Sequence, residues 1–309
     1  MQARFPFSYY SESGKPDADY YKRLKTSPAL DELTLEFAQA AVDGENLGLQ
    51  PGRSVTDVLG VSMSAHDYVN HTYGPESKMS HDHLQRLDRM LANFFSFLDK
   101  RVGMDNVVVV LTADHGFANV PEFSQTRHID AQRLDGDKLA ADLETHLAAT
   151  FSVPKLVKKP SIPNFYLDYE AAAKANIGRV ALEDAAARFL LQQPGVAEVF
   201  SRTQMENGVV ATRTAKLMRR GWNRQMSGDL MVVSKPFWIF SSEKTGTTHG
   251  SPYAYDTNVP LILMGKRWIK PGSYGQYAEV VDIVPTLGHL LRVRPCLGAE
   301  GRVLTETLR

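Results

Sequence analysis

The run NVVVVLT at residues 106–112 constrains the fold more than any other segment of the chain. Four consecutive valines and a leucine suit a strand that is covered on both faces of an α/β sheet. Asp114, His115 and Gly116 follow almost at once. Functional groups of open parallel sheets gather at the carboxyl ends of strands, so a carboxylate and an imidazole stand where a ligand is expected. The alternative is an Asp that caps the next turn beside a structural His.

Asp67 and His71 stand four positions apart in a second polar segment, AHDYVNHTYGPES. If this segment is helical, both side chains project from one face, because residues i and i+4 are neighbours on a helix. A loop could also bring them together. The apolar residues at 55–63 before this segment predict a buried strand. Taken alone, the spacing of Asp67 and His71 is more typical of a solvated pair than of metal ligands.

His249 lies in the loop TTHGSPYAYD, ahead of an apolar strand predicted at residues 259–265. By itself, a single His in such a loop does not indicate a functional site. With Asp67, His71, Asp114 and His115, however, it makes a nearly complete ligand set for two divalent metals. Neutral imidazole and carboxylate are usual zinc ligands, and two zincs about 4 Å apart can hold both oxygens of an in-line displacement at phosphorus.

Motifs along most of the chain, in a fixed order, resemble one family. They are DYVNHTYGPES, Arg86-Leu87-Asp88, ADHG, THGSPYAYD, VVDIVPTLGHLL and EGRVL. As a set they are similar to the alkaline phosphatase superfamily, above all to its phosphate-irrepressible alkaline phosphatases and its type I phosphodiesterase/nucleotide pyrophosphatase group. The resemblance implies two Zn²⁺ ions. It places one on Asp67, His71 and His249, and the other on Asp114 and His115.

The resemblance also implies a nucleophilic Thr or Ser and one further Asp, both from an amino-terminal part of the core that precedes the matching segment. Nothing before Asp67 fits that nucleophile, so the catalytic residue is expected to be missing from this chain, which alone is expected to be inactive. A few hydroxyl groups near the ligands could substitute, but local hydrogen bonding is their more typical role. These are Ser62, Ser64, Thr112, Thr247 and Thr248.

The function implied by the resemblance is hydrolysis of a small phosphate monoester through a phospho-enzyme. A phosphodiesterase or nucleotide pyrophosphatase of the same superfamily is the alternative, and a non-catalytic metal-binding fragment is a further one. The family is commonly exported, which implies a periplasmic or secreted intact protein. The first residues of this chain do not have the sequence pattern of a signal peptide.

The predicted fold is α/β: an alkaline-phosphatase-like, mostly parallel sheet flanked by helices, here partial, with a small inserted α+β lobe. Residues 1–123 and 227–309 are assigned to the metallohydrolase core, and residues 124–226 to the lobe, which would shape access of substrate to the metals. Periodicity predicts helices at 30–44, 79–101, 138–151, 180–192 and 282–291, and strands at 164–168, 196–200 and 228–234. The last of these strands is expected to return to the main sheet.

Composition excludes several partners and cross-links. Lys+Arg and Asp+Glu both total 35, and this balance argues against a nucleic-acid polymer as partner. Nothing in the sequence predicts a membrane span. The single Cys296 excludes an intrachain disulfide. Among the other histidines, His66 could at most support a ligand. His81 and His83 could bind adventitious metal, but the polar start of a helix is their more typical interpretation.

Overall fold

The computed structural model describes residues 14–49, 55–208, 211–294 and 296–309. The chain divides into two compact units. The first consists of residues 1–72, 77–116 and 258–309, and the second of residues 73–76 and 117–257. Each unit has its own hydrophobic core.

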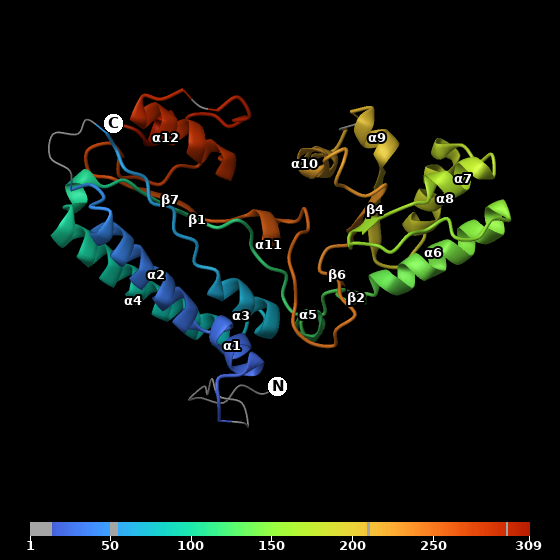
Figure 1. Ribbon diagram of the computed structural model, residues 1–309, viewed down its shortest axis with the longest axis horizontal. Helices are drawn as coiled ribbons and strands as arrows, with labels where there is room; N and C mark the ends of the chain where they lie inside the picture. Colours follow the sequence, from blue (N-terminus) through green and yellow to red (C-terminus); the bar gives the residue numbers. More distant parts are fainter. Residues whose placement is uncertain (1–13, 50–54, 209–210, 295) are drawn as a thin grey trace. The chain divides into compact units, whose positions relative to one another are not determined.

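Two long helices, α2 (Pro28–Gly44) and α4 (Lys78–Arg101), form the main core of the first unit and confirm the helices predicted at 30–44 and 79–101. They lie side by side (Figure 1). Their apolar positions recur at helical spacing, which gives each helix one stripe to bury. The buried members of this core are Leu35, Ala38, Val42, Phe94 and Leu98. A shorter helix, α1 (Ala18–Lys25), precedes them.

Between α2 and α4 lies helix α3 (Ala65–Tyr73), which buries Ala65, Val69 and Asn70. The segment before it corrects the sequence analysis. The buried strand predicted at residues 55–63 is wrong, because residues 55–64 have no regular structure and are mostly exposed. A buried strand needs partners for its backbone N–H and C=O groups, and among the described residues no strand pairs with this segment.

The predicted apolar strands near residues 106–112 and 259–265 are confirmed as β1 (Val109–Thr112) and β7 (Leu261–Met264). They pair antiparallel, with Val109 opposite Met264, and β1 is half-buried rather than covered on both faces. A 3-10 turn, η1 (Met104–Asn106), precedes β1. The predicted last helix is confirmed as α12 (Ile283–Leu291), with Pro285 in its first turn. Two further 3-10 turns are η2 (Val280–Asp282) and η3 (Thr305–Thr307).

The second unit is built around a three-stranded antiparallel sheet in the order β3 (Asn164–Phe165), β5 (Leu230–Ser234), β4 (Val196–Ser201). The expectation that residues 228–234 return to the main sheet is therefore wrong. All five residues of β5 are buried, as the central position between two strands requires. An apolar run predicts a buried strand, but it carries no information on which sheet receives it.

Helices pack on this sheet to form the second core. The predicted helices at 138–151 and 180–192 are confirmed as α6 (Gly136–Phe151) and α8 (Arg179–Leu191). Their buried leucines meet the sheet residues Phe165, Val199 and Leu230. Shorter elements complete the unit: α5 (Pro121–Thr126), α7 (Tyr169–Lys174), α9 (Arg202–Glu206), α10 (Arg213–Gly221), α11 (Ala254–Thr257), and the parallel pair β2 (Arg133–Leu134) and β6 (Ile239–Phe240).

The predicted α/β class is confirmed. In detail, the described strands form three small sheets, of which only β2–β6 is parallel. Within the described ranges, no helix is both long and apolar enough to span a membrane.

Candidate metal centre

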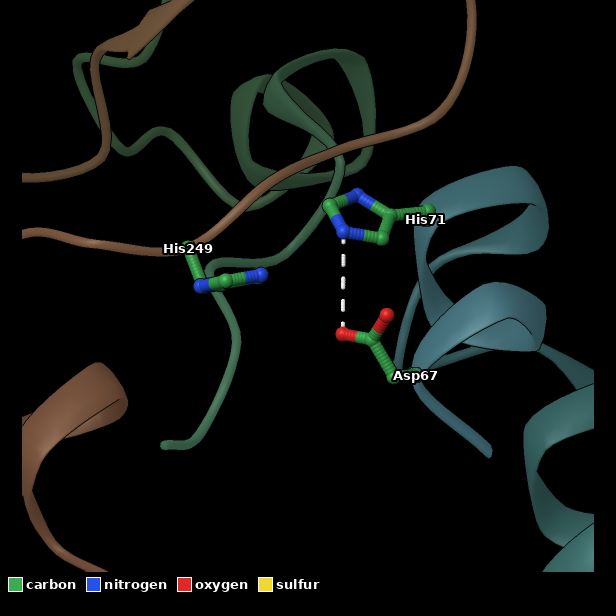
Figure 2. A group of neighbouring side chains, drawn as sticks. All are labelled: Asp67, His71 and His249. Carbon is green, nitrogen blue, oxygen red and sulfur yellow. Dashed lines mark ion pairs between the residues drawn. The ribbon is translucent and has the colours of Figure 1, made fainter. Parts of the chain in front are cut away.

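Helix α3 carries two of the predicted ligands. Asp67 and His71 lie one turn apart, and His71 Nε2 is 3.6 Å from Asp67 Oδ1 (Figure 2). The structure thus decides between the two geometries that the spacing allowed, in favour of the helix. About a third of each side chain is exposed, so both remain accessible to an ion.

Asp114 and His115 follow β1 directly, at its carboxyl end. His115 Nε2 lies 3.7 Å from Asp67 Oδ1 and 3.7 Å from Asp114 Oδ2. The Asp67 carboxylate therefore lies near two imidazole nitrogens, those of His71 and His115. These separations are longer than hydrogen bonds. They approach the roughly 3.3–3.5 Å between ligand atoms expected for tetrahedral zinc with bonds of about 2.0–2.1 Å.

The tautomer of His115 is determined by its own loop. His115 Nδ1 lies 3.0 Å from the carbonyl oxygen of Gly116. A carbonyl only accepts hydrogen bonds, so Nδ1 carries the proton and Nε2 of the neutral ring keeps its lone pair. A hydrogen bond of this kind is the usual support for a metal-binding His. His115 is therefore prepared to donate through the nitrogen that faces Asp67 and Asp114.

His249 is held in its loop by contacts to the residues that follow His115 in the chain. Its ring meets Phe117 edge-on, with ring centroids 5.0 Å apart. Two residues earlier, the buried Thr247 hydroxyl donates to the carbonyl oxygen of Ala118 over 2.9 Å. Phe117 and Ala118 come two and three positions after His115. The contacts therefore tie the His249 loop to Phe117 and Ala118 within the second unit.

Asp67, His71 and His249 form a group that could hold a metal ion. Each offers one ligand atom, and these three atoms lie within 4.8 Å of one another (Figure 2). One carboxylate oxygen and two imidazole nitrogens are a donor set that suits zinc.

The other histidines singled out in the sequence behave differently. His66 Nε2 pairs with the Ser80 hydroxyl at 2.9 Å. Burial, helped by the neighbouring His83, lowers the pKa of His66 to about 4, so this ring is neutral near pH 7. His83 is completely buried and pairs with the equally buried Asp31 over 2.8 Å. The interpretation of His83 as part of a polar helix start is therefore wrong, because Asp31 lies 52 positions away and only helix packing brings the two together.

Three of the hydroxyl groups near the ligands make local contacts. Thr112 donates to the neighbouring carbonyl of Ala113, and Ser62 pairs with Ser64. These contacts agree with the local roles expected of the side chains. Thr247 differs, because its hydroxyl donates to a carbonyl oxygen 129 positions away, that of Ala118.

Glu76 in the second unit is a half-buried carboxylate that sequence reasoning missed. Its Oε1 accepts a hydrogen bond from the backbone N–H of Val120 over 3.3 Å. Burial raises the pKa of this carboxyl above its ordinary value. The signal in the sequence was slight: Glu76 follows a Gly-Pro turn four positions after Thr72 and shows no periodic pattern.

Comparison with known proteins decides the family. The model of the type I phosphodiesterase / nucleotide pyrophosphatase family matches residues 3–254. The chain belongs to this family. It is thereby a member of the alkaline phosphatase superfamily, as the motifs indicated.

Similar proteins have names that point to phosphate chemistry. The chain is 33% identical over 290 residues to a protein named calcium-transporting ATPase from Myroides odoratus, covering 93% of this chain and 52% of the relative. It is 32% identical over 286 residues to alkaline phosphatase PafA of Elizabethkingia meningoseptica, covering 92% of this chain and 51% of PafA. A crystal structure of PafA superimposes with a TM-score of 0.85 at 31% identity, covering 93% of this chain and 54% of that chain. The chain thus spans about half the length of these relatives.

Proposed function

We propose that this chain carries the metal-binding part of a two-zinc phosphate monoester hydrolase of the alkaline phosphatase type. The observation that carries the proposal is the position of Asp67, whose Oδ1 lies 3.6 Å from His71 Nε2 and 3.7 Å from His115 Nε2. A carboxylate oxygen with imidazole nitrogens beside it suits a divalent cation, because these are the usual oxygen and nitrogen ligands of zinc. The similarity to proteins named alkaline phosphatases supports a phosphate ester as substrate.

In this proposal Asp67, His71 and His249 hold one zinc, and Asp114 and His115 hold the other. When bound, the two ions would supply Lewis acidity toward the phosphoryl oxygens and lower the pKa of a coordinated hydroxyl. The chain's own residues orient the ligands. Gly116 keeps the His115 proton on Nδ1, and the bond from Thr247 to Ala118 holds the loop of His249.

The nucleophile is proposed to be a Thr or Ser that these 309 residues do not supply. Its hydroxyl oxygen attacks phosphorus in line, and the alcohol of the ester leaves. Water then displaces the enzyme's oxygen from the phospho-enzyme and releases inorganic phosphate, so two inversions give net retention at phosphorus.

The organic group of the ester has a candidate place beside His249. A cavity of about 230 Å³ in the second unit is lined by residues 248–252 and by apolar side chains, among them Ile162, Val232 and Trp238. A cavity of this size accommodates a small organic group, which fits a small-molecule ester. By family resemblance we expect the intact protein to act in the periplasm or outside the cell.

A phosphodiesterase or nucleotide pyrophosphatase is the second candidate, and the matching family model favours it by name. The two activities are distinguished by the substrate that is hydrolysed with the higher kcat/KM. A monoesterase hydrolyses 4-nitrophenyl phosphate with a higher kcat/KM than bis(4-nitrophenyl) phosphate, and a diesterase shows the reverse order. A polypeptide with the full length of the relatives is the material for this comparison.

Zinc stoichiometry tests the ligand assignment on the 309-residue chain itself. We expect Asp67→Ala and His249→Ala to lose bound zinc after dialysis, as measured by atomic emission. The exposed His81→Ala on α4 is the matched control and should keep the wild-type zinc content. An unchanged zinc content in Asp67→Ala would contradict the assignment of Asp67 as a zinc ligand. Turnover of 4-nitrophenyl phosphate by the 309-residue chain that EDTA abolishes would overturn the claim about the nucleophile, and a chain that binds no zinc at all would overturn the proposed function.

A further inference from the structure

A buried polar pair joins α2 and α4 to α3, the helix that carries Asp67 and His71. Asp31 in the first turn of α2 and His83 on α4 are both fully buried, with His83 Nε2 2.8 Å from Asp31 Oδ2. The other carboxylate oxygen, Oδ1, accepts a hydrogen bond from the backbone N–H of Ala65 over 3.0 Å. One carboxylate on α2 therefore contacts both α4 and the first residue of α3.

The contact with Ala65 satisfies a specific need of α3. The first N–H groups of a helix have no partner inside the helix, and a buried one must find an acceptor elsewhere. Ala65 is itself fully buried, so water does not meet this need. Asp31 acts as the N-terminal cap of α3 from a different helix, and its negative charge suits the positive end of the helix dipole.

The first turn of α3 is fixed on a second side. His66 Nε2 pairs with the buried Ser80 hydroxyl of α4 at 2.9 Å, and the His66 and His83 rings lie with centroids 5.2 Å apart. The segment before α3, residues 55–64, is mostly exposed and has no regular structure. The orientation of α3 thus depends on these buried contacts more than on the chain that leads into it.

Asp67 comes two residues after Ala65, and His71 one turn later, so any movement of the first turn moves both side chains. We infer that Asp31 and His83 are positioning residues for the metal centre: through the cap on Ala65 they hold Asp67 and His71 at the angle that a metal requires. This inference rests on the proposed metal site. Their effect passes through the backbone of α3, because Asp31 accepts from the Ala65 N–H.

The test must separate positioning from stability. Removing one partner of a buried ion pair leaves an uncompensated polar group, whereas replacing both by apolar residues of similar total volume is often neutral. The double variant Asp31→Ala/His83→Leu applies that rule to the pair itself: it nearly keeps the total volume of the two side chains, and the one buried group that it leaves without its acceptor is the Ala65 N–H. We expect it to fold, by circular dichroism and thermal unfolding, and to bind zinc about ten- to a hundredfold more weakly in competition with a chromophoric chelator.

Two single variants sharpen the result. Asp31→Asn keeps an oxygen for the Ala65 N–H, so it should retain zinc affinity within about threefold of wild type. Asp43→Asn is the matched control, because Asp43 also links α2 to α4, through Arg101 Nε at 2.6 Å, but at an exposed position. Its zinc affinity should equal that of wild type.

A folded Asp31→Ala/His83→Leu variant with wild-type zinc affinity would overturn the inference. If that variant does not fold, Ser80→Ala decides instead, since it removes only the bond to His66. A several-fold loss of zinc affinity in Ser80→Ala supports the inference, and an unchanged affinity contradicts it. Asp67→Asn distinguishes a failure of the proposed metal site from a failure of the positioning role. If Asp67→Asn also binds zinc like wild type, the proposed metal site is wrong, and the role of Asp31 and His83 is not what failed.

Discussion

At the scale of single residues, the site depends on side chains that are not ligands. His115 is held in one tautomer by the Gly116 carbonyl, and the loop of His249 is held by the Thr247 hydroxyl. The loss of such a support commonly lowers metal affinity about ten- to a hundredfold. A loop rich in Gly, Ser and Thr needs them, because its backbone has few regular hydrogen bonds.

We predict that Thr247→Val loosens the His249 loop. Valine keeps the shape of threonine but leaves the buried Ala118 carbonyl without the hydroxyl that donates to it over 2.9 Å. The loss of one buried hydrogen bond costs about 1–3 kcal/mol. Urea unfolding should show this decrease in stability, and a chelator competition should show weaker zinc binding.

Two variants control this experiment. Thr247→Ser retains the donor and should recover most of the lost zinc affinity. Thr150→Val removes an exposed hydroxyl on α6 that donates to a carbonyl within its own helix. Thr150→Val should change neither the free energy of unfolding nor the free energy of zinc binding by more than about 0.5 kcal/mol. If Thr247→Val unfolds and binds zinc like wild type, the loop does not depend on this bond.

At the scale of elements, the second unit is joined around a buried carboxylate. Glu183 on α8 is 1% exposed. It accepts hydrogen bonds from Tyr169 Oη at 2.7 Å, Arg179 Nε at 2.8 Å and the Thr203 backbone N–H at 3.0 Å. Burial by itself raises the pKa of Glu183, but these three donors outweigh it and hold the pKa below its ordinary value. One side chain thereby connects α7, α8 and α9.

We predict that Glu183→Gln destabilises the second unit by about 1–3 kcal/mol at pH 7, because the amide presents its own N–H groups to donors that the carboxylate had accepted. The pH dependence follows from the lowered pKa. The stabilisation by Glu183 is complete above its unfolded-state pKa of 4.5 and is lost as the pH falls through the lower folded-state pKa. Unfolding by urea at pH 7 and at successively lower pH measures both effects.

The variant should therefore lose less stability than wild type on acidification below about pH 4.5. Glu170→Gln on α7 is the control, since Glu170 forms only an exposed i,i+4 pair with Lys174. Such pairs contribute about 0.3–0.5 kcal/mol. A Glu183→Gln variant that is as stable as Glu170→Gln would show that the buried network is not what joins these helices.

At the scale of the whole molecule, the sequence predicted the helices and strands that have a local pattern of apolar residues. Helices α2, α4, α6, α8 and α12 were found because apolar residues recur with the helical period, and β1 and β7 because apolar runs end at Gly or polar residues. The ligand set followed from motifs in a fixed order, and the structure brings Asp67, His71 and His249 into one group. All five residues, Asp67, His71, His249, Asp114 and His115, stay predictions as metal ligands.

What the sequence did not predict depends on contacts between distant positions. Asp31 and His83 are 52 positions apart, and no period relates them. An apolar run such as residues 230–234 fits any sheet that can bury it, so its place between β3 and β4 was missed. Residues 55–63 have the composition of a strand, but composition supplies no partner strand. Long-range pairing decides each of these cases.

Zinc binding should also affect the stability of the whole chain. A ligand that binds only the folded state stabilises it by RT ln(1 + [L]/Kd), which is about 2.7 kcal/mol at a concentration 100 times Kd. Zinc should therefore raise the Tm of this protein in a concentration-dependent manner, because its ligands come from positions 67 to 249 and assemble only on folding. Differential scanning calorimetry with increasing zinc measures the rise, and excess EDTA should reverse it. In Asp67→Asn the rise should be much smaller at every zinc concentration. The exposed His81→Ala serves again as the control, and a Tm that zinc raises equally in wild type and Asp67→Asn would place the stabilising ion at some other site.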